Sequence, residues 1–499
     1  MTELEWVRRA QSFAGRVAVT SDGQDYSYES LLSVSGAIAA NLLEGAPDLG
    51  ESRIAFLIPA SFEYVAVQWG IWRAGGIAVP LSLSAADPEL EHVITDARVD
   101  RIIVREESLE RLSPLCERLS VPLVSFDRLS SPPPPQPVSL PNVGTERRAM
   151  ILYTSGTTSK PKGVVSTHAN IQAQITTLVE AWGWRSDDWI PLFLPLHHVH
   201  GIVNVQGCAL WSGARVDCFH SFDATVVLER VAAKDYSVFM AVPTIYVKLI
   251  RFLEAADESD RVRYTDGFAH MRLMVSGSAA LPASVHEQWT GLTGQKLLER
   301  YGMTEIGMAL SNPLHGERRP GAVGKPLPGV AVRLIGEEGG VIQEEGVPGE
   351  IQVRGPAVFS EYWDKPDVTR ESFVDGWFST GDMAVVEDGY YRIMGRLSVD
   401  IIKSGGYKLS ALEIEDTLRT HPSIRECAVV GMPDDTWGEA VAVAIVLRDG
   451  EHIDLPGLKE WAAERMSGYK IPKSLLLLED LPRNAMGKVT KPAVQELFG

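Results

Sequence analysis

Hydroxyl side chains and glycines gather in the segment YTSGTTSKPKGV, which begins at Tyr153. It follows AMIL, which is typical of a strand. Backbone N–H groups and hydroxyls in such a loop can bind an anion, and Lys160 and Lys162 add positive charge. The segment departs from the Walker phosphate-binding motif, because counting from Gly156 Pro161 stands where that motif requires a glycine before its lysine. From composition alone, a phosphate-binding loop and a flexible surface loop are equally good interpretations.

Three later stretches carry single polar residues that could act on a bound molecule. In ERYGMTEIGM, Glu305 is a hard oxygen ligand of the kind that Mg²⁺ accepts. In FSTGDMAVVEDGYYRIMGR, Asp382 follows a glycine and suits ribose hydroxyls, with Arg396 farther on. In PRNAMGKVTK, Lys488 follows a glycine. Taken singly, each of these residues is more simply a solvated surface or turn residue.

Length and charge restrict the class of protein. A chain of 499 residues, 45% of them hydrophobic, is long enough for about two or three domains. The net charge of −18 argues against a nucleic-acid partner and against docking on anionic membranes. No apolar run is long enough to cross a bilayer, so no membrane insertion is expected. The start, MTELEWVRRAQSFAGRVAV, resembles neither a secretory signal nor an acid-poor transit peptide, and the cysteines lack metal-ligand spacing. We therefore expect free thiols and a cytoplasmic location.

Strand-like and helix-like segments alternate in the first third of the chain. RIAFLIPAS, IAVPL and RIIVRE read as buried strands, and FEYVAVQWGIWRAGG reads as a helix that ends at glycine. This alternation predicts an α/β fold with a parallel sheet covered by helices. The proline run SSPPPPQP, residues 130–137, predicts an extended surface connector.

The last hundred residues predict a small α+β unit. KLSALEIEDTLRTH carries a capping box, with Ser410 at the N-cap and Glu413 three residues later. ECAVVGM and AVAVAIVL read as strands, and a helix is expected through LKEWAAERM. The joint with the preceding part is expected near GRLSVDIIKSGG.

Together, the four motifs resemble, in order and spacing, the adenylate-forming superfamily of acyl-CoA synthetases, luciferases and peptide-synthetase adenylation domains. The resemblance covers essentially the whole chain. It implies an N-terminal domain of layered sheets and helices, residues 1–396, that binds ATP and an acid. It also implies a small mobile α+β domain, residues 397–499, that carries an adenylation lysine.

The resemblance also implies roles for individual residues. The phosphates of ATP would be surrounded by Thr154, Ser155, Gly156, Thr157, Thr158, Ser159, Lys160 and Lys162. The adenine and acyl pockets would be lined by Ser276, Gly277, Ser278, Tyr301, Gly302, Met303 and Thr304. Asp382 and Arg396 would hold the ribose, and Glu305 would hold Mg²⁺ with help from Thr154. Lys488 would bridge the attacking carboxylate and the α-phosphate, where two anions are forced together. Ser159 departs from the glycine that is usual in the family.

A second half-reaction is implied in which the acyl adenylate meets a thiol after the C-terminal domain rotates. The hinge would be Ser398, where relatives commonly carry aspartate or lysine. Coenzyme A (CoA) would then be bound by Lys403, Ser404, Gly405 and Gly406. The two glycines would leave room for a pantetheine arm, although a plain β-turn explains them as well. No carrier-protein domain follows Gly499, so free CoA is the expected acceptor.

The acid is indicated by residues near the expected acyl pocket. In LPLHHVHGI, His198 and His200 flank a valine, and Arg300 directly precedes YGMTE. A cation there would suit a second carboxylate, which arginine can bind with two parallel hydrogen bonds. The alternative is that Arg300 faces a surface acid such as Glu299. His200, Arg300, Ser278 and Met303 are thus the expected acid-binding residues.

These stretches, with SNPLHGERR and GRLSVDIIKSGGYKLSALEIE, closely resemble the malonyl-CoA synthetases. The resemblance implies an ATP-dependent ligase that converts malonate and CoA into malonyl-CoA, AMP and pyrophosphate. A CoA ligase for methylmalonate or another short acid, and an adenylation module that loads a separate carrier protein, are the alternatives.

Overall fold

The computed structural model describes residues 4–132, 139–154, 161–404, 407–434, 437–483 and 489–499. Most of the proline run therefore lies outside the described residues. So do the following predicted site residues: Ser155, Gly156, Thr157, Thr158, Ser159, Lys160, Gly405, Gly406 and Lys488.

A seven-stranded sheet forms the first layer, in the order β18-β8-β7-β4-β3-β5-β6. Its parallel core confirms the predicted arrangement: β3 (Arg53–Leu57), β4 (Ile77–Pro80), β5 (Arg101–Val104), β6 (Leu123–Ser125) and β7 (Arg148–Thr154). The edge departs from it, because β8 (Lys162–Thr167) and β18 (Glu361–Tyr362) add antiparallel strands. The antiparallel turn from β7 to β8 brings Thr154 opposite Lys162.

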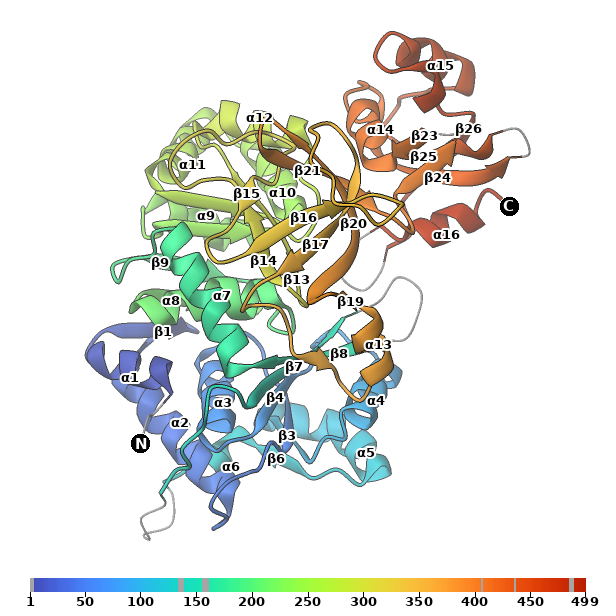
Figure 1. Cartoon of the computed structure of the whole chain (residues 1–499). Coiled ribbons are helices and arrows are strands. Elements are labelled where there is room, and N and C mark those ends of the chain that lie inside the picture. Colours follow the sequence, from blue (N-terminus) through green and yellow to red (C-terminus); the bar gives the residue numbers. More distant parts are fainter. Residues whose placement is uncertain (1–3, 133–138, 155–160, 405–406, 435–436, 484–488) are drawn as a thin grey trace.

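Helices cover both faces of this sheet (Figure 1). Ile54 and Phe56 pack with α2 (Tyr28–Leu43) and α3 (Phe62–Arg73), whereas Ala55 and Leu57 pack with α4 (Asp87–Asp96) and α5 (Leu109–Leu119). The alternation follows from the two-residue period of a strand. Ser61 caps α3 by accepting the N–H of Tyr64. Shorter elements complete this region: α1 (Glu5–Ser12), the 3₁₀ turn η1 (Glu106–Ser108) and α6 (Phe126–Ser130).

A second group of strands lies above the first sheet in Figure 1. One sheet runs β11 (Val238–Ala241), β12 (Leu273–Ser276), β13 (Leu298–Met303), β14 (Gly307–Ser311) and β15 (Lys325–Pro326). Its first three strands are parallel. Another runs β2 (Gln24–Ser27), β1 (Val17–Ser21), β10 (Arg215–Cys218) and β9 (Trp189–Leu192). The helices of this region are α7 (His168–Ala181), η2 (His200–Gly207), α8 (Cys208–Ser212), α9 (Ala224–Ala232), α10 (Pro243–Ala255), α11 (Glu258–His270) and α12 (Ala283–Thr293).

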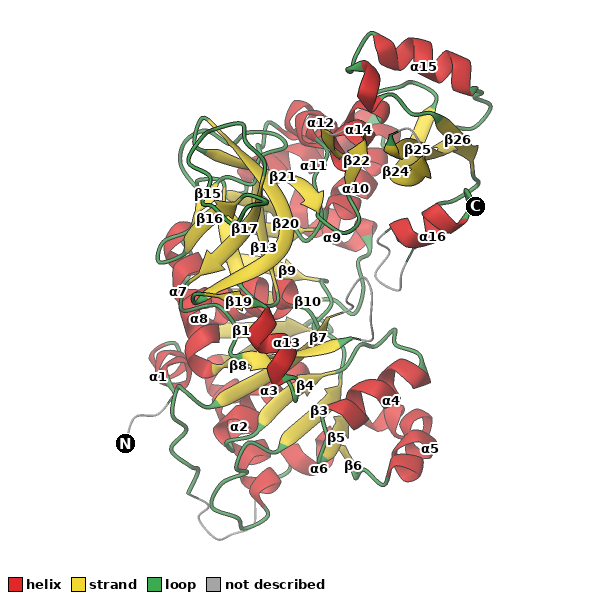
Figure 2. Cartoon of the chain, turned by 45° about the vertical axis from the view of Figure 1, so that its right-hand side comes forward, coloured by secondary structure: helices red, strands yellow, loops and turns green. Residues whose placement is uncertain are grey.

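A fourth sheet leads toward the C-terminal part of the chain (Figure 2). It consists of β16 (Ala331–Ile335), β17 (Gly349–Arg354), β19 (Phe373–Val374), β20 (Trp377–Glu387) and β21 (Tyr390–Arg396), with α13 (Pro366–Glu371) between β17 and β19 along the chain. Within the described ranges, none of the helices has the length and apolar character that crossing a bilayer requires. All four cysteines are buried and unpaired, as expected.

The C-terminal segment forms a separate α+β unit at the upper right of Figure 1. Its sheet contains β22 (Ile401–Ser404), β23 (Tyr407–Ser410), β24 (Ile424–Asp434), β25 (Gly438–Leu447) and β26 (Ser474–Leu477). Its helices are α14 (Ala411–Leu418), α15 (Leu455–Ala463), η3 (Gly468–Lys470) and α16 (Lys491–Glu496).

Two local predictions for this unit need correction. The helix expected through LKEWAAERM already ends at Ala463. The capping box is only half formed: Ser410 accepts the N–H of Glu413, but the carboxylate of Glu413 pairs with Lys470 on η3. A tertiary ion pair thus replaces the local hydrogen bond that the sequence pattern predicts.

Candidate active site

A buried arginine lies where β12 and β13 run side by side. Ser276 is the register partner of Glu299, so Arg300 lies beside Gly277 at the carboxyl end of β12. Arg300 is only 4% exposed. A Cβ at Gly277 would lie 2.5 Å from Arg300 Nε, so the missing side chain makes room for the guanidinium. The glycine that was predicted to line a nucleotide pocket therefore also positions Arg300.

Arg300, Ser278 and His200 lie together, as the sequence predicted for an acid pocket. Arg300 Nη2 donates to Ser278 Oγ at 3.3 Å, and His200 Nδ1 lies 3.1 Å from the same oxygen. Among the described residues, Arg300 Nε and His200 Nε2 are buried without a hydrogen-bond partner. Ser278 has φ +71°, a strained conformation for a residue with a side chain. The three side chains thus converge with unused donor capacity.

The electrostatics of this cluster favour a bound anion. Burial lowers the pKa of Arg300 to about 9, because a buried guanidinium loses hydration. Burial and the nearby charge of Arg300 lower the pKa of His200 well below its ordinary value, so this imidazole is neutral at pH 7. An anion against Arg300 would offset the lost hydration.

The alternative partner for Arg300 is not supported. Glu299 is 4% exposed and is not a surface acid. Its Oε1 accepts the N–H of Gly321 at 3.1 Å, and no ion pair with Arg300 occurs within the described part of the chain. Neighbouring residues of a strand point to opposite faces, which separates the two side chains.

The histidine is carried by an unusual helix. His200 opens η2, a π-helix that runs to Gly207 and is buried over most of its length. Such wide turns occur often at functional sites. This geometry could not be predicted, since HGIVNVQG has no period that distinguishes a π-helix from an α-helix.

A second cluster joins β13, β20 and β21. Arg396 Nε lies 3.0 Å from Asp382 Oδ1, and the two residues are register partners on adjacent strands. Tyr301 donates its hydroxyl to Asp382 Oδ2 at 2.6 Å. Each carboxylate oxygen has two lone pairs, so Asp382 can still accept hydrogen bonds from a diol. The predicted ribose pair is therefore assembled, with Tyr301 beside it.

A third cluster surrounds Glu305, which is 5% exposed. Tyr362 on β18 donates its hydroxyl to Glu305 Oε1 at 3.0 Å, and Lys162 Nζ lies 5.1 Å from the centroid of the Tyr362 ring. Burial raises the pKa of Glu305, while the charges of Arg396 and Lys162 act in the opposite direction. The sequence did not identify Tyr362 as a site residue, because a tyrosine next to a tryptophan is more typical of a hydrophobic core.

The remaining predicted residues lie around these clusters. Ser276 is fully buried, and its Oγ has no hydrogen-bond partner among the described residues. Gly302 lies in the β13–β14 hairpin, where a Cβ would meet the carbonyl oxygen of Gly307 at 2.1 Å. Met303 ends β13 and Thr304 begins the turn that leads to Glu305; both are half-buried.

The predicted hinge and thiol-binding residues lie after β21. Ser398 is exposed in the turn between β21 and β22. Lys403 and Ser404 end β22, with Lys403 exposed and Ser404 buried. These positions lie just after Arg396, where the chain passes from β21 into the C-terminal unit.

Comparison with known proteins assigns the chain to one family. A family described as AMP-binding enzyme matches residues 6–363, and its C-terminal domain matches residues 413–488. A mitochondrial malonate–CoA ligase of Mus musculus is 46% identical over 97% of this chain and 88% of its own length. A malonate–CoA ligase of Arabidopsis thaliana is 41% identical over 98% and 87%. The crystal structure of ATP-bound MatB from Rhodopseudomonas palustris is similar with a TM-score of 0.91 and 32% identity, covering 100% of this chain and 99% of that one.

Proposed function

Because the chain belongs to the AMP-binding enzyme family, we propose that it is a malonate–CoA ligase. The reaction joins malonate to CoA and converts ATP to AMP and pyrophosphate. Relatives named for this activity are 41–46% identical over almost the whole chain. ATP and CoA are therefore co-substrates.

The observation that supports malonate is the buried guanidinium of Arg300 beside Ser278 and His200. Malonate has two carboxylates, and only one reacts with ATP. The other would be buried beside the reacting centre, which costs several kcal/mol unless a cation is present. Arg300 supplies the cation, and neutral His200 supplies a further hydrogen bond through Ser278 or directly.

For the first half-reaction, we assign the ribose to Asp382 and Arg396 and the phosphates to the loop between β7 and β8. Lys162 lies at the end of that loop, opposite Thr154, and would contribute positive charge to the phosphates. Lys488 would bring a point charge to the α-phosphate and the attacking carboxylate, where it offsets their mutual repulsion.

Glu305 fits a magnesium ion, because it is a buried carboxylate whose described partners include the neutral hydroxyl of Tyr362. Within the described residues, no cluster of three or more histidine, cysteine or acidic side chains converges on one point. Mg²⁺ is often bound by one or two carboxylates, and substrate phosphates complete its coordination shell. Thr154 is the second proposed ligand. When bound, the ion would neutralise charge on the phosphates.

For the second half-reaction, we assign residues 1–396 and 397–499 to two domains that change orientation about Ser398. Rotation would withdraw Lys488 and present the segment 403–406 to the acyl adenylate. Free CoA is the proposed thiol. A cytoplasmic location stays a prediction, and the relatives from animals carry the word mitochondrial in their names.

An acid panel tests the proposal. Purified protein is incubated with ATP, Mg²⁺ and malonate, methylmalonate, acetate, propionate or butyrate, with and without CoA. Release of AMP and pyrophosphate, fastest with malonate and dependent on CoA, is expected. Production of ADP and phosphate would contradict adenylation. AMP release that needs an acyl carrier protein in place of CoA would support the carrier-loading alternative.

A further inference from the structure

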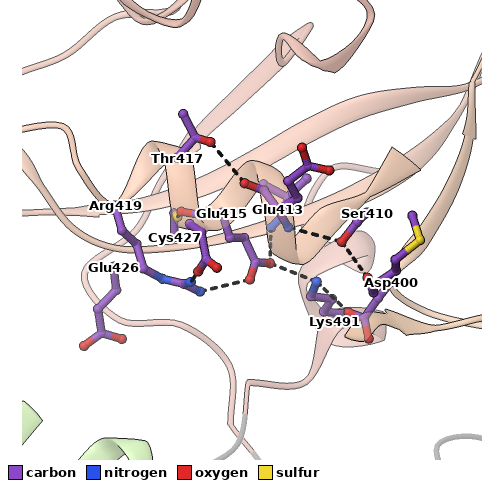
Figure 3. A network of polar contacts seen from close by, with 12 residues as sticks. Asp400, Ser410, Glu413, Glu415, Thr417, Arg419, Glu426, Cys427 and Lys491 are labelled. Carbon is purple, nitrogen blue, oxygen red and sulfur yellow. Dashed lines mark hydrogen bonds and ion pairs between the residues drawn. The ribbon is translucent and has the colours of Figure 1, made fainter. Parts of the chain in front are cut away.

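A buried lysine joins the domain junction to the C-terminal unit. Lys491 is the first residue of α16 and is 8% exposed. Its Nζ lies 2.6 Å from Asp400 Oδ1 and 2.8 Å from Glu415 Oε1 (Figure 3). A buried ammonium is costly without opposite charge, and these carboxylates supply it.

Asp400 uses its two carboxylate oxygens on different parts of the molecule. Oδ1 faces Lys491, while Oδ2 accepts the N–H of Arg396, the last residue of β21, at 2.9 Å. The N–H of Asp400 also donates to the carbonyl of Arg396 at 2.8 Å. Gly395 has φ +121°, and a Cβ there would lie 2.3 Å from Asp400 Cβ. Glycine thus allows the carboxylate to reach back to the strand that carries the proposed ribose residue.

Glu415 anchors the other side of Lys491. It is 3% exposed on α14. Its Oε1 accepts the N–H of Val429 on β24 at 2.8 Å, and its Oε2 accepts from Arg419 at 2.9 Å. Lys491 therefore holds α14, α16 and the end of the junction turn together (Figure 3).

We propose that Lys491 is a positioning residue of the ligase reaction, acting through Asp400 to attach the turn 396–400 to the C-terminal unit. This inference rests on the proposed function and its domain rotation. The Lys491–Asp400 pair then moves with the C-terminal unit, and Asp400 releases the N–H of Arg396 when the unit turns. The bend is confined to the residues between Arg396 and Asp400, so the orientation of the unit is set at one short turn.

A double-mutant cycle tests the link. Lys491→Met removes the charge and keeps the chain length, Lys491→Arg keeps the charge, and Asp400→Asn keeps the shape of its partner. Lys491→Met should slow the overall reaction by roughly tenfold or more through kcat, with the KM for ATP nearly unchanged. Lys491→Arg should restore most of the rate. Because both residues act through one contact, Lys491→Met/Asp400→Asn should be no slower than the worse single variant.

A matched control comes from a second lysine that pairs with an acid on α14. Lys470 pairs with Glu413 on α14 but makes no described contact with the turn 396–400. Lys470→Met should stay within about twofold of wild type, as expected for a partly exposed pair away from the turn. If Lys491→Met fails to fold, Asp400→Asn and Lys491→Arg still provide the comparison.

Domain orientation gives a readout that activity does not. The native cysteines are buried, so cysteines introduced at exposed Glu258 and Lys459 can be labelled with a donor and an acceptor dye. Energy transfer should show discrete interdomain distances in wild type with ATP, and a broadened distribution in Lys491→Met and Asp400→Asn. Unchanged distributions, or additive effects of the two substitutions, would overturn the inference. Wild-type protein that changes orientation with ATP but does not activate malonate would instead contradict the proposed function alone.

Discussion

The guanidinium of Arg300 lies 3.3 Å from the hydroxyl of Ser278, and both belong to a cluster in which Arg300 is buried. Among the described residues, no carboxylate forms an ion pair with Arg300. The relationship is unusual, because a buried arginine is normally paired. A bound dianion would complete it. The choice of acid can therefore be tested at this residue.

Arg300→Met should reduce the preference for malonate. Removing one partner of a buried charged pair costs on the order of 3–5 kcal/mol, or roughly a hundredfold or more in specificity. Acetate, propionate and butyrate lack the second carboxylate, so their kcat/KM should change little. The measurement is the malonate-to-butyrate ratio of kcat/KM in wild type and variant, with ATP binding as the control. An unchanged ratio would remove the main physical support for malonate.

The pH profile should report the same group. Arg300 must be protonated to bind the distal carboxylate, and its pKa in the free protein is lowered to about 9 by burial. As the pH rises through that value, the neutral form grows, so kcat/KM for malonate should fall about tenfold per pH unit above it. Butyrate needs no such cation. The ratio of the two values between pH 7 and 10 isolates Arg300 from other titrations. A flat ratio would contradict the assignment.

Sequence reasoning located these residues but could not supply their neighbours. The alternation of strands and helices follows from hydrophobic period, which is local, and the parallel core around β3 appeared as predicted. The Glu413–Lys470 pair, the hydrogen bond from Gly321 to Glu299 and the hydrogen bond from Tyr362 to Glu305 join residues that are 57, 22 and 57 positions apart. Such contacts depend on tertiary packing, and no local pattern encodes them.

Glu305→Gln should raise the magnesium requirement. The substitution keeps the shape of the side chain and an oxygen for Tyr362, but removes the negative charge. Loss of a metal-supporting group commonly weakens affinity by about 10- to 100-fold, so the Mg²⁺ concentration for half-maximal pyrophosphate exchange should rise by at least about tenfold. Tyr362→Phe is the comparison, because it removes the hydrogen bond to Glu305 but keeps the charge, and it should raise the requirement less than Glu305→Gln does. Identical Mg²⁺ titrations for wild type and Glu305→Gln would exclude Glu305 as a ligand.

Lys488→Ala should separate the two half-reactions. If the lysine stabilises only the charge that forms during adenylation, its loss should slow acid-dependent pyrophosphate exchange by about 10²- to 10³-fold. The same variant should convert supplied malonyl adenylate and CoA to thioester at nearly the wild-type rate, because rotation has withdrawn the lysine by then. Equal losses in both assays would show that Lys488 is structural or that the domain does not rotate.

The turn after β21 gives the last prediction. Ser398 is exposed, and the bonds that close the turn run from the N–H groups of Val399 and Asp400 to the carbonyl of Arg396 at 3.1 and 2.8 Å. Ser398→Pro fixes φ near −65° and removes one donor, so it should restrict rotation without removing a packed side chain. Pyrophosphate exchange should be retained, while thioester formation should slow by about tenfold or more. Ser398→Ala, which keeps the backbone free, should leave both rates near wild type. The two half-reactions are measured separately on the same preparations. A proline variant with an unchanged overall rate would place the pivot outside this turn, and one that loses pyrophosphate exchange alone would mean that the turn serves adenylation and not rotation.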